Sequence, residues 1–152
     1  MQTHSDKPRT YKTEGVVIRH SSSGEADLVL AIYTADYGTI HVVGRGLRRA
    51  KSRLAGHLQP LSHVAIQLIR GKGIDIVTSA DTLHGYTALR SNLEGIARGL
   101  VCVEMVEAFA PEEQSNQELY KLLLDALGLL NDGEGDRPVS YTHLTLPTIL
   151  LV

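Results

Sequence analysis

Apolar and polar residues alternate along the first half of the chain, and this alternation predicts short β-strands. In the run 25–34 both alternating sets are apolar, which predicts a strand that is partly covered on both faces. The breaks between the runs carry Gly, Ser, Asp and Pro, which are turn residues. Five strands are therefore expected, over residues 11–20, 25–34, 39–44, 60–70 and 74–78.

The number and spacing of these strands indicate a small barrel. Five strands with one longer connection between the third and the fourth match the partly open Greek-key barrel called the OB-fold, whose strands and loops commonly hold single-stranded nucleic acid. A small SH3-like barrel fits the pattern nearly as well. The alternation alone leaves both barrels open.

From residue 88 the spacing of apolar residues changes to three and four, which predicts a helix over 88–109 that ends before Pro111. A second helix is predicted over Leu119–Leu130, because Ser115 and Glu118 form a capping-box pattern ahead of an apolar stripe. The two helices are expected to form an antiparallel pair. The predicted fold class is α+β, with a five-stranded OB-fold barrel over 1–86 and an incomplete helical domain over 87–137.

The last segment, 138–152, differs in composition from everything before it, because it contains no charged residue. Residues 139–148 resemble the peptide produced when a sequencing-library transposon adapter is translated in frame. We therefore expect a non-native tail over 138–152 and a natural protein that is cut off near Arg137. A short apolar C-terminal strand is the alternative.

Composition narrows the class of protein. The chain has 152 residues, of which 43% are apolar and 21% charged, as in a soluble globular protein of about one domain. Its single cysteine, Cys102, excludes a zinc site built from paired cysteines within this stretch and fits a reducing compartment. The start, Met1–Thr10, is polar and lacks the apolar core of a secretory signal. A cytoplasmic protein with no membrane partner is expected.

The charge is distributed unevenly. Residues 1–90 hold 12 Lys and Arg against 7 Asp and Glu, a net charge of +5, whereas residues 91–152 hold 3 against 10, a net charge of −7. Lys and Arg bind polyanions by releasing condensed counterions, and Gly44 and Gly46 are expected to let backbone amides approach a phosphate. The densest basic stretch predicts a phosphate-binding loop that contains Arg45, Arg48, Arg49, Lys51 and Arg53. Arg70 and Lys72, in the hairpin between the fourth and fifth predicted strands, would extend this basic surface. A merely solvated surface is the alternative.

Other chemistry is weakly signalled. The seven histidines show no metal-ligand spacing, and His57 and His63 are either phosphate contacts or structural residues. Tyr33 or Tyr37 could stack on a base, although packing between strands is the more common role of such tyrosines. There is no P-loop and no nucleophile elbow, and Cys102 within a helix is expected to be a buried, inert thiol. The sequence therefore predicts no enzyme.

Several stretches resemble the RecO family of bacterial DNA repair and recombination mediators. The similarity covers roughly residues 10–131. It follows the order and spacing of the family through Tyr-Lys-Thr-Glu-Gly-Val-Val-Ile-Arg (11–19), Gly-Glu-Ala-Asp (24–27), Tyr-Thr-Ala-Asp-Tyr-Gly (33–38), Gly-Leu-Arg-Arg-Ala-Lys-Ser-Arg-Leu (46–54) and His-Leu-Gln-Pro-Leu (57–61).

The resemblance implies an N-terminal OB-fold, a helical domain, and binding and annealing of DNA, both single- and double-stranded. It implies partners as well: RecR, RecF and single-stranded DNA-binding protein, with which such proteins help to load the RecA recombinase. It also places the family's basic barrel surface on the loop cations 45, 48, 49, 51 and 53. The family's cysteine cluster is missing, so no cofactor is expected in this chain and zinc only in the missing C-terminal part.

The function predicted from the sequence is a non-enzymatic DNA-binding mediator whose helical half meets partner proteins. A protein-interaction adaptor that uses the barrel as a scaffold is the main alternative. A small hydrolase or transferase that uses the scattered histidines is disfavoured, because no catalytic spacing occurs.

Overall fold

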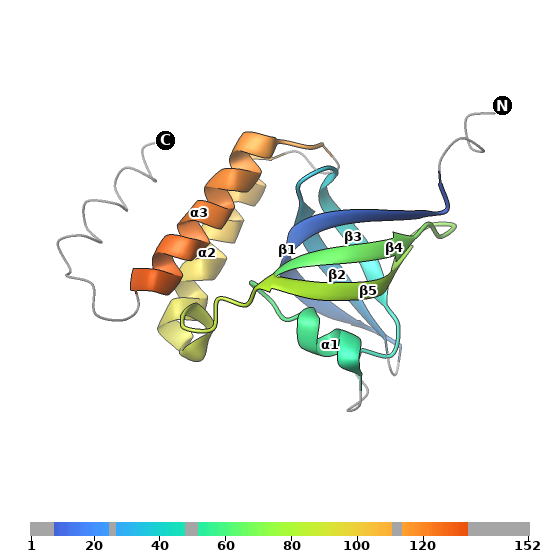
Figure 1. Cartoon of the computed structure of the whole chain (residues 1–152), viewed down its shortest axis with the longest axis horizontal. Coiled ribbons are helices and arrows are strands. Elements are labelled where there is room, and N and C mark those ends of the chain that lie inside the picture. Colours follow the sequence, from blue (N-terminus) through green and yellow to red (C-terminus); the bar gives the residue numbers. More distant parts are fainter. Residues whose placement is uncertain (1–7, 25–26, 48–51, 111–113, 134–152) are drawn as a thin grey trace.

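Five strands form a closed barrel in the computed structural model, which describes residues 8–24, 27–47, 52–110 and 114–133 (Figure 1). All five predicted strands are present, and the first and the last are longer than predicted. The predicted tail at 138–152 lies outside the described residues. The strands are β1 (Thr10–Ser23), β2 (Asp27–Thr34), β3 (Gly38–Gly44), β4 (His63–Ile69) and β5 (Asp75–His84), in the spatial order β1-β2-β3-β5-β4.

The barrel closes because β1 pairs with two neighbours. Its first part is antiparallel to β4, where Thr10 lies opposite Ile69, and its second part is antiparallel to β2, where His20 lies opposite Leu30. A register shift follows Val17 on the β2 side of this long strand. β3 and β5 are parallel neighbours. This Greek-key barrel is the predicted OB-fold.

A short helix, α1 (Arg53–His57), lies between β3 and β4 and was not predicted. Its five residues are too few to show helical periodicity. Ser52 caps it, since its hydroxyl accepts a hydrogen bond of 3.2 Å from the Ala55 amide. The following residue, Leu58, is fully buried in the barrel and holds the helix in place.

The strand β2 shows why both of its alternating sets are apolar. Leu30 and Ile32 point into the barrel and are fully buried there. Ala31 and Tyr33 point outward and are 3% and 1% exposed, because the helices cover this face of the barrel. The prediction that both faces are covered is confirmed.

The helical half begins with a 3-10 turn, η2 (Leu89–Ser91), and continues with α2 (Leu93–Phe109) and α3 (Gln117–Gly133). The prediction of one continuous helix over 88–109 was wrong for its first residues, which form η2 and the cap of α2. Asn92 adopts an extended backbone and caps α2 by accepting a 2.7 Å hydrogen bond from Gly95.

Asn116, rather than Ser115, caps α3, because its side chain accepts a hydrogen bond of 3.0 Å from the Leu119 amide. The two helices lie side by side against β1 and β2, as an antiparallel pair (Figure 1). Within the described ranges, no helix is long and apolar enough to span a membrane.

Candidate nucleic-acid interface

The basic connection between β3 and α1 begins with an anchored turn. Leu47 folds back into the barrel, where its side chain is 4% exposed. The Gly46 amide donates a hydrogen bond of 2.8 Å to Oδ1 of Asp27, at the start of β2. Arg45 precedes these two anchors and is exposed to solvent. Its side chain therefore extends from a backbone that the barrel holds in place.

Both glycines of this turn are used by the fold. A Cβ on Gly44 would lie 2.1 Å from Cδ1 of Leu47, so the absence of a side chain is what lets Leu47 pack there. The amide of Gly46 is already bound to Asp27. The expectation that an open amide approaches a phosphate is therefore wrong for Gly46, and it stays a prediction for Gly44.

The structure describes two of the five cations predicted in this connection. Arg45 and Arg53 are exposed and stand at its two ends. None of the carboxylates within the described ranges forms an ion pair with either of them. Both charges are available to an external anion. The other three, Arg48, Arg49 and Lys51, lie outside the described residues.

The two cations of the β4–β5 hairpin differ in their surroundings. The Arg70 guanidinium lies 4.3 Å from the centroid of the Tyr11 ring, and its Nε donates a hydrogen bond of 3.0 Å to the Pro8 carbonyl. The Tyr11 hydroxyl in turn donates to the Asp75 carboxylate. Burial, and then this hydrogen bond, raise the pKa of Tyr11. Lys72, in contrast, is exposed in the hairpin loop.

The β4–β5 hairpin and the helix α1 lie at different edges of the barrel (Figure 1). β3 and β5 run parallel, with Val43 opposite Ile76. Arg45 follows Val43 and Lys72 precedes Ile76, so the two cations lie on either side of this pairing along the strands. They flank the junction of β3 and β5, and the expectation that the hairpin cations extend the basic loop stays a prediction.

The two candidate stacking tyrosines have opposite environments. Tyr33 is 1% exposed and packs between the barrel and α3, with its ring centroid 6.0 Å from that of Tyr120. Burial raises the pKa of Tyr33. Tyr33 is therefore a packing residue. Tyr37, on the turn between β2 and β3, is 37% exposed and meets the Tyr11 ring edge-on at 5.3 Å.

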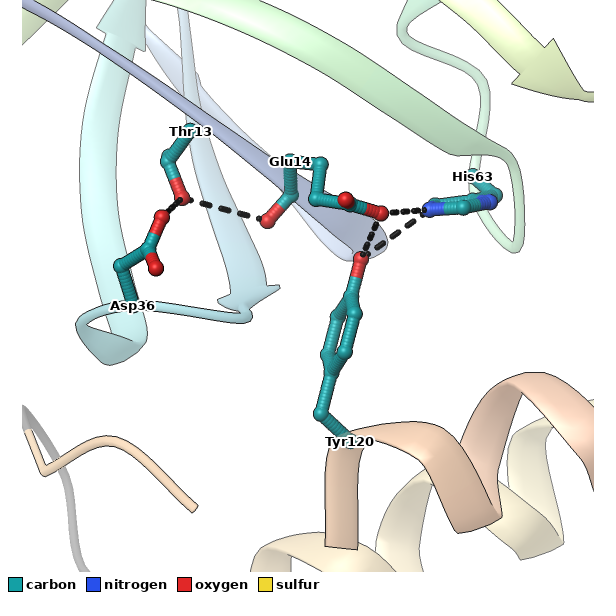
Figure 2. Close-up of polar contacts among 5 residues, drawn as sticks. All are labelled: Thr13, Glu14, Asp36, His63 and Tyr120. Carbon is teal, nitrogen blue, oxygen red and sulfur yellow. Dashed lines mark hydrogen bonds and ion pairs between the residues drawn. The ribbon is translucent and has the colours of Figure 1, made fainter. Parts of the chain in front are cut away.

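A polar cluster joins the barrel to the helices (Figure 2). Nε2 of His63 lies 2.6 Å from Oε2 of Glu14, and the Tyr120 hydroxyl donates a hydrogen bond of 2.9 Å to the same carboxylate oxygen. His63 is 6% exposed, so its ring is not a phosphate contact. Thr13, beside Glu14, binds the Asp36 carboxylate at 2.9 Å (Figure 2).

The same cluster was missed by sequence reasoning. The one local signal is Glu14 itself, a charged residue on the outward face of β1, where Val16 and Ile18 are buried. His57 also has a structural role, because its Nδ1 lies 2.8 Å from the Thr82 hydroxyl and ties α1 to β5.

Two further contacts fix the acidic helices on the barrel. The Arg19 guanidinium forms an ion pair of 2.6 Å with Glu107 of α2. The Gln117 side chain of α3 donates a hydrogen bond of 2.7 Å to the Ala35 carbonyl. The helices therefore cover β1 and β2, on the side of the barrel away from the β4–β5 hairpin (Figure 1). The hairpin cations are thereby kept apart from the acidic half.

No metal-binding group of three or more His, Cys, Asp or Glu side chains occurs in the part of the chain that the structure describes. Cys102 is half-buried and packs against the core of the helices. Burial raises the pKa of its thiol, which disfavours the reactive thiolate.

Comparison with known proteins places these features in a family. Residues 9–86 match the family model described as recombination protein O N terminal, and residues 90–145 match recombination protein O C terminal. The second match includes the first residues of the predicted tail.

Curated relatives named DNA repair protein RecO match most of the chain. The relative from Dehalococcoides mccartyi (strain CBDB1) is 35% identical over 127 residues, which are 84% of this chain and 50% of the relative. That from Roseiflexus sp. (strain RS-1) is 38% identical over 127 residues, covering 84% of this chain and 44% of the relative. That from Desulforudis audaxviator (strain MP104C) is 38% identical over 134 residues, covering 88% and 53%.

The chain therefore spans about half the length of the curated relatives that it matches. Both family models match in the order in which the barrel and the helices occur, and identity exceeds one third over most of the chain. The chain belongs to the recombination protein O family of DNA repair proteins.

Proposed function

We propose that this chain is the DNA-binding part of a recombination mediator and has no enzymatic activity of its own. The observation that carries the proposal is the separation of charge. Residues 1–90 carry a net charge of +5 and residues 91–152 a net charge of −7. Three exposed cations extend from the barrel: Arg45, Arg53 and Lys72. None of them forms an ion pair among the described residues, and the acidic helices cover another side of the barrel.

Cations in this arrangement bind the nucleic-acid backbone and not the bases. Each phosphate that a Lys or Arg neutralises releases condensed counterions, so the affinity falls as salt is added. Contacts of this kind carry no sequence information. The barrel is therefore expected to bind single- and double-stranded DNA of any sequence, which is the property that strand annealing needs.

The proposal extends to partners. A mediator of this family acts with RecR and RecF and contacts single-stranded DNA-binding protein, so that the RecA recombinase is loaded onto DNA. We assign the partner contacts to the helical half, whose negative charge disfavours DNA. Its place of action is the cytoplasm, and no cofactor takes part.

The test is a titration of single-stranded oligonucleotide across a salt series. Neutralising Arg48, Arg49 and Lys51 together to Gln should weaken binding to every sequence. It should also lower the slope of log affinity against log salt by about 2, since each contact with a single strand contributes about 0.7. Lys121→Gln, on the exposed side of α3, is the matched control and should leave the slope unchanged. If the wild type and the triple variant bind with the same affinity and the same salt slope, the assignment of the DNA contacts to this loop is refuted.

A second candidate function is a protein-interaction adaptor. It is supported by exposed apolar side chains along α2, where Leu93 and Phe109 are 83% and 76% exposed. The same titration separates the two candidates. An adaptor binds no oligonucleotide at low salt, whereas a mediator does.

A further inference from the structure

Three planar side chains meet at the end of the barrel away from α1. Tyr37 comes from the β2–β3 turn, Tyr11 from the start of β1, and Arg70 from the end of β4. The rings of Tyr37 and Tyr11 are edge-on at 5.3 Å with an interplanar angle of 74°, and the Arg70 guanidinium lies 4.3 Å from the Tyr11 centroid. The cluster combines a cation with two aromatic rings, one of which is accessible.

The fold holds this cluster in a fixed geometry. The Tyr37 amide donates a hydrogen bond of 3.0 Å to the Thr34 hydroxyl, which itself donates to the Gly38 carbonyl at 2.7 Å. Arg70 is fixed through the Pro8 carbonyl, at 3.0 Å. A ligand that stacks here therefore meets a preorganised surface and loses little additional side-chain entropy.

Packing within the barrel explains the positions of Tyr33 and Tyr11, but it does not explain why the Tyr37 ring lies at the surface. Tyr33 is buried, and the Tyr11 ring packs against the barrel core. Tyr37 remains 37% exposed although it lies on a turn that the fold holds tightly. An aromatic ring kept at the surface in this way is suited to a flat ligand.

The acids around the cluster accept hydrogen bonds from neutral donors and keep their negative charge, so an anionic ligand would be attracted by the cations Arg70 and Lys72. The two acids that face it are engaged by the fold: Asp36 accepts from the Thr13 hydroxyl at 2.9 Å, and Asp75 accepts from Tyr11 and from the Gly71 amide at 3.1 Å. Lys72 is exposed on the neighbouring hairpin and has no ion pair with a described carboxylate.

We propose that Tyr37 is a stacking platform for an unpaired base of single-stranded DNA, with Lys72 at the adjacent phosphate. The proposal rests on the DNA binding proposed above and adds a position at which the base itself is held. Every base has an aromatic face, so such a platform tolerates any sequence. It favours single strands, because bases stacked within a duplex are not free to stack on a side chain.

The first experiment uses the absence of tryptophan from the chain. Tyr37→Trp introduces a single tryptophan at the platform, and its emission, excited selectively over that of the tyrosines, should be quenched when a short oligothymidylate is added at low salt. Phe109→Trp places the fluorophore on α2, where Phe109 is 76% exposed, and serves as the matched control. It should bind the same oligonucleotide without quenching.

The second experiment measures affinity in the full chain. Tyr37→Ala should weaken binding of oligothymidylate by about 5- to 100-fold, the range expected for the loss of one stacked base, and leave the salt slope unchanged. Tyr37→Phe should keep the affinity, since the ring remains. With an oligonucleotide of abasic residues, wild type and Tyr37→Ala should bind alike. Lys72→Gln should lower the salt slope by about 0.7 and preserve quenching of Tyr37→Trp.

The outcomes separate this proposal from the one on which it rests. If the wild-type protein does not bind oligothymidylate at low salt, both the proposed DNA binding and the stacking platform are refuted. A different result overturns the platform and leaves the proposed DNA binding intact. In that result wild type and Tyr37→Ala bind with equal, salt-dependent affinity, and the emission of Tyr37→Trp is not quenched. A melting temperature of Tyr37→Phe equal to that of wild type, together with full affinity, supports the role of the ring.

Discussion

The Tyr120 hydroxyl donates a hydrogen bond of 2.9 Å to Oε2 of Glu14 and so joins α3 to β1 across 106 positions of the sequence (Figure 2). Tyr120 is 3% exposed, and its hydroxyl also lies 3.0 Å from Nε2 of His63. The contact is polar and directional within an interface that is mainly apolar. Such a network favours one docked arrangement of the helices over others of similar apolar area.

Tyr120→Phe should destabilise the protein, because it removes the hydroxyl and keeps the ring. A hydrogen bond to a charged group contributes about 1.5–3 kcal/mol, and partial exposure of the Glu14 side chain places the expected loss at about 1–2 kcal/mol. Urea unfolding should show a lower midpoint with an unchanged slope. Tyr37→Phe, which alters an exposed ring, is the control. Equal midpoints for wild type and Tyr120→Phe would contradict the prediction.

Gly38→Ala should lower the free energy of unfolding more than Gly24→Ala does. Gly38 has a φ of +68°, and a Cβ there would lie 2.5 Å from the backbone oxygen of Gln114, in the connection between α2 and α3. We expect a loss of about 2–4 kcal/mol, from the left-handed backbone and from the clash together.

Gly24→Ala supplies the matched control for that experiment. Gly24 has a φ of +71°, yet no atom of the described residues lies within 4 Å of a Cβ placed there. This variant should lose about 1–2 kcal/mol from the backbone conformation alone. Thermal unfolding of the two variants measures the difference. If both lose the same stability, the Gly38–Gln114 approach is not a constraint on helix docking.

Stability should fall at alkaline pH as the buried tyrosines ionise. Burial, with a smaller contribution from Asp125, raises the pKa of Tyr86 from 10.0 to about 12. Because the folded pKa is raised, the contribution of Tyr86 is fully present below pH 10 and is lost as the pH rises toward 12.

Tyr86→Phe tests this linkage, since phenylalanine keeps the ring and cannot ionise. Melting temperatures measured between about pH 9 and about pH 12 should fall less steeply in the variant than in wild type. Some fall should remain, because burial also raises the pKa of Tyr11 and Tyr120. Identical profiles would show that Tyr86 ionises equally easily in the folded and unfolded chains.

The chain should associate with itself through the outer side of α2. This helix is apolar on both sides: Val103 and Val106 are buried, while Leu93 and Val101 are 83% and 53% exposed. Exposed apolar patches of this kind promote association. Replacing Leu93 and Val101 by Gln should reduce the concentration dependence of the sedimentation coefficient.

Leu83→Gln is the control for association. Leu83 is 45% exposed, but it lies on β5 of the barrel. Its replacement should leave sedimentation unchanged. A reduction as large as that of the α2 variant would indicate association through general surface hydrophobicity instead of this helix.

Local patterns in the sequence determined the elements. Alternation placed all five strands, and the double apolar set of β2 predicted its two covered faces, because side chains along a strand point alternately to opposite sides. Spacing of three and four placed α2 and α3 for the equivalent reason in helices. Elements without periodicity were missed or misplaced. The helix α1 has only five residues, and each cap of α2 and α3 depends on a single hydrogen bond that the side chain of Asn92 or Asn116 accepts from a backbone amide.

Only the tertiary structure decided which residues meet. Tyr33 and Tyr37 were both candidates for base stacking, yet the helices bury the first and leave the second accessible. Arg45 and Lys72 are 27 positions apart in the sequence, but the parallel pairing of β3 and β5 places them on either side of one strand junction. Periodicity describes how one element faces its surroundings, whereas these outcomes depend on contacts between elements far apart in the chain, to which no local spacing corresponds.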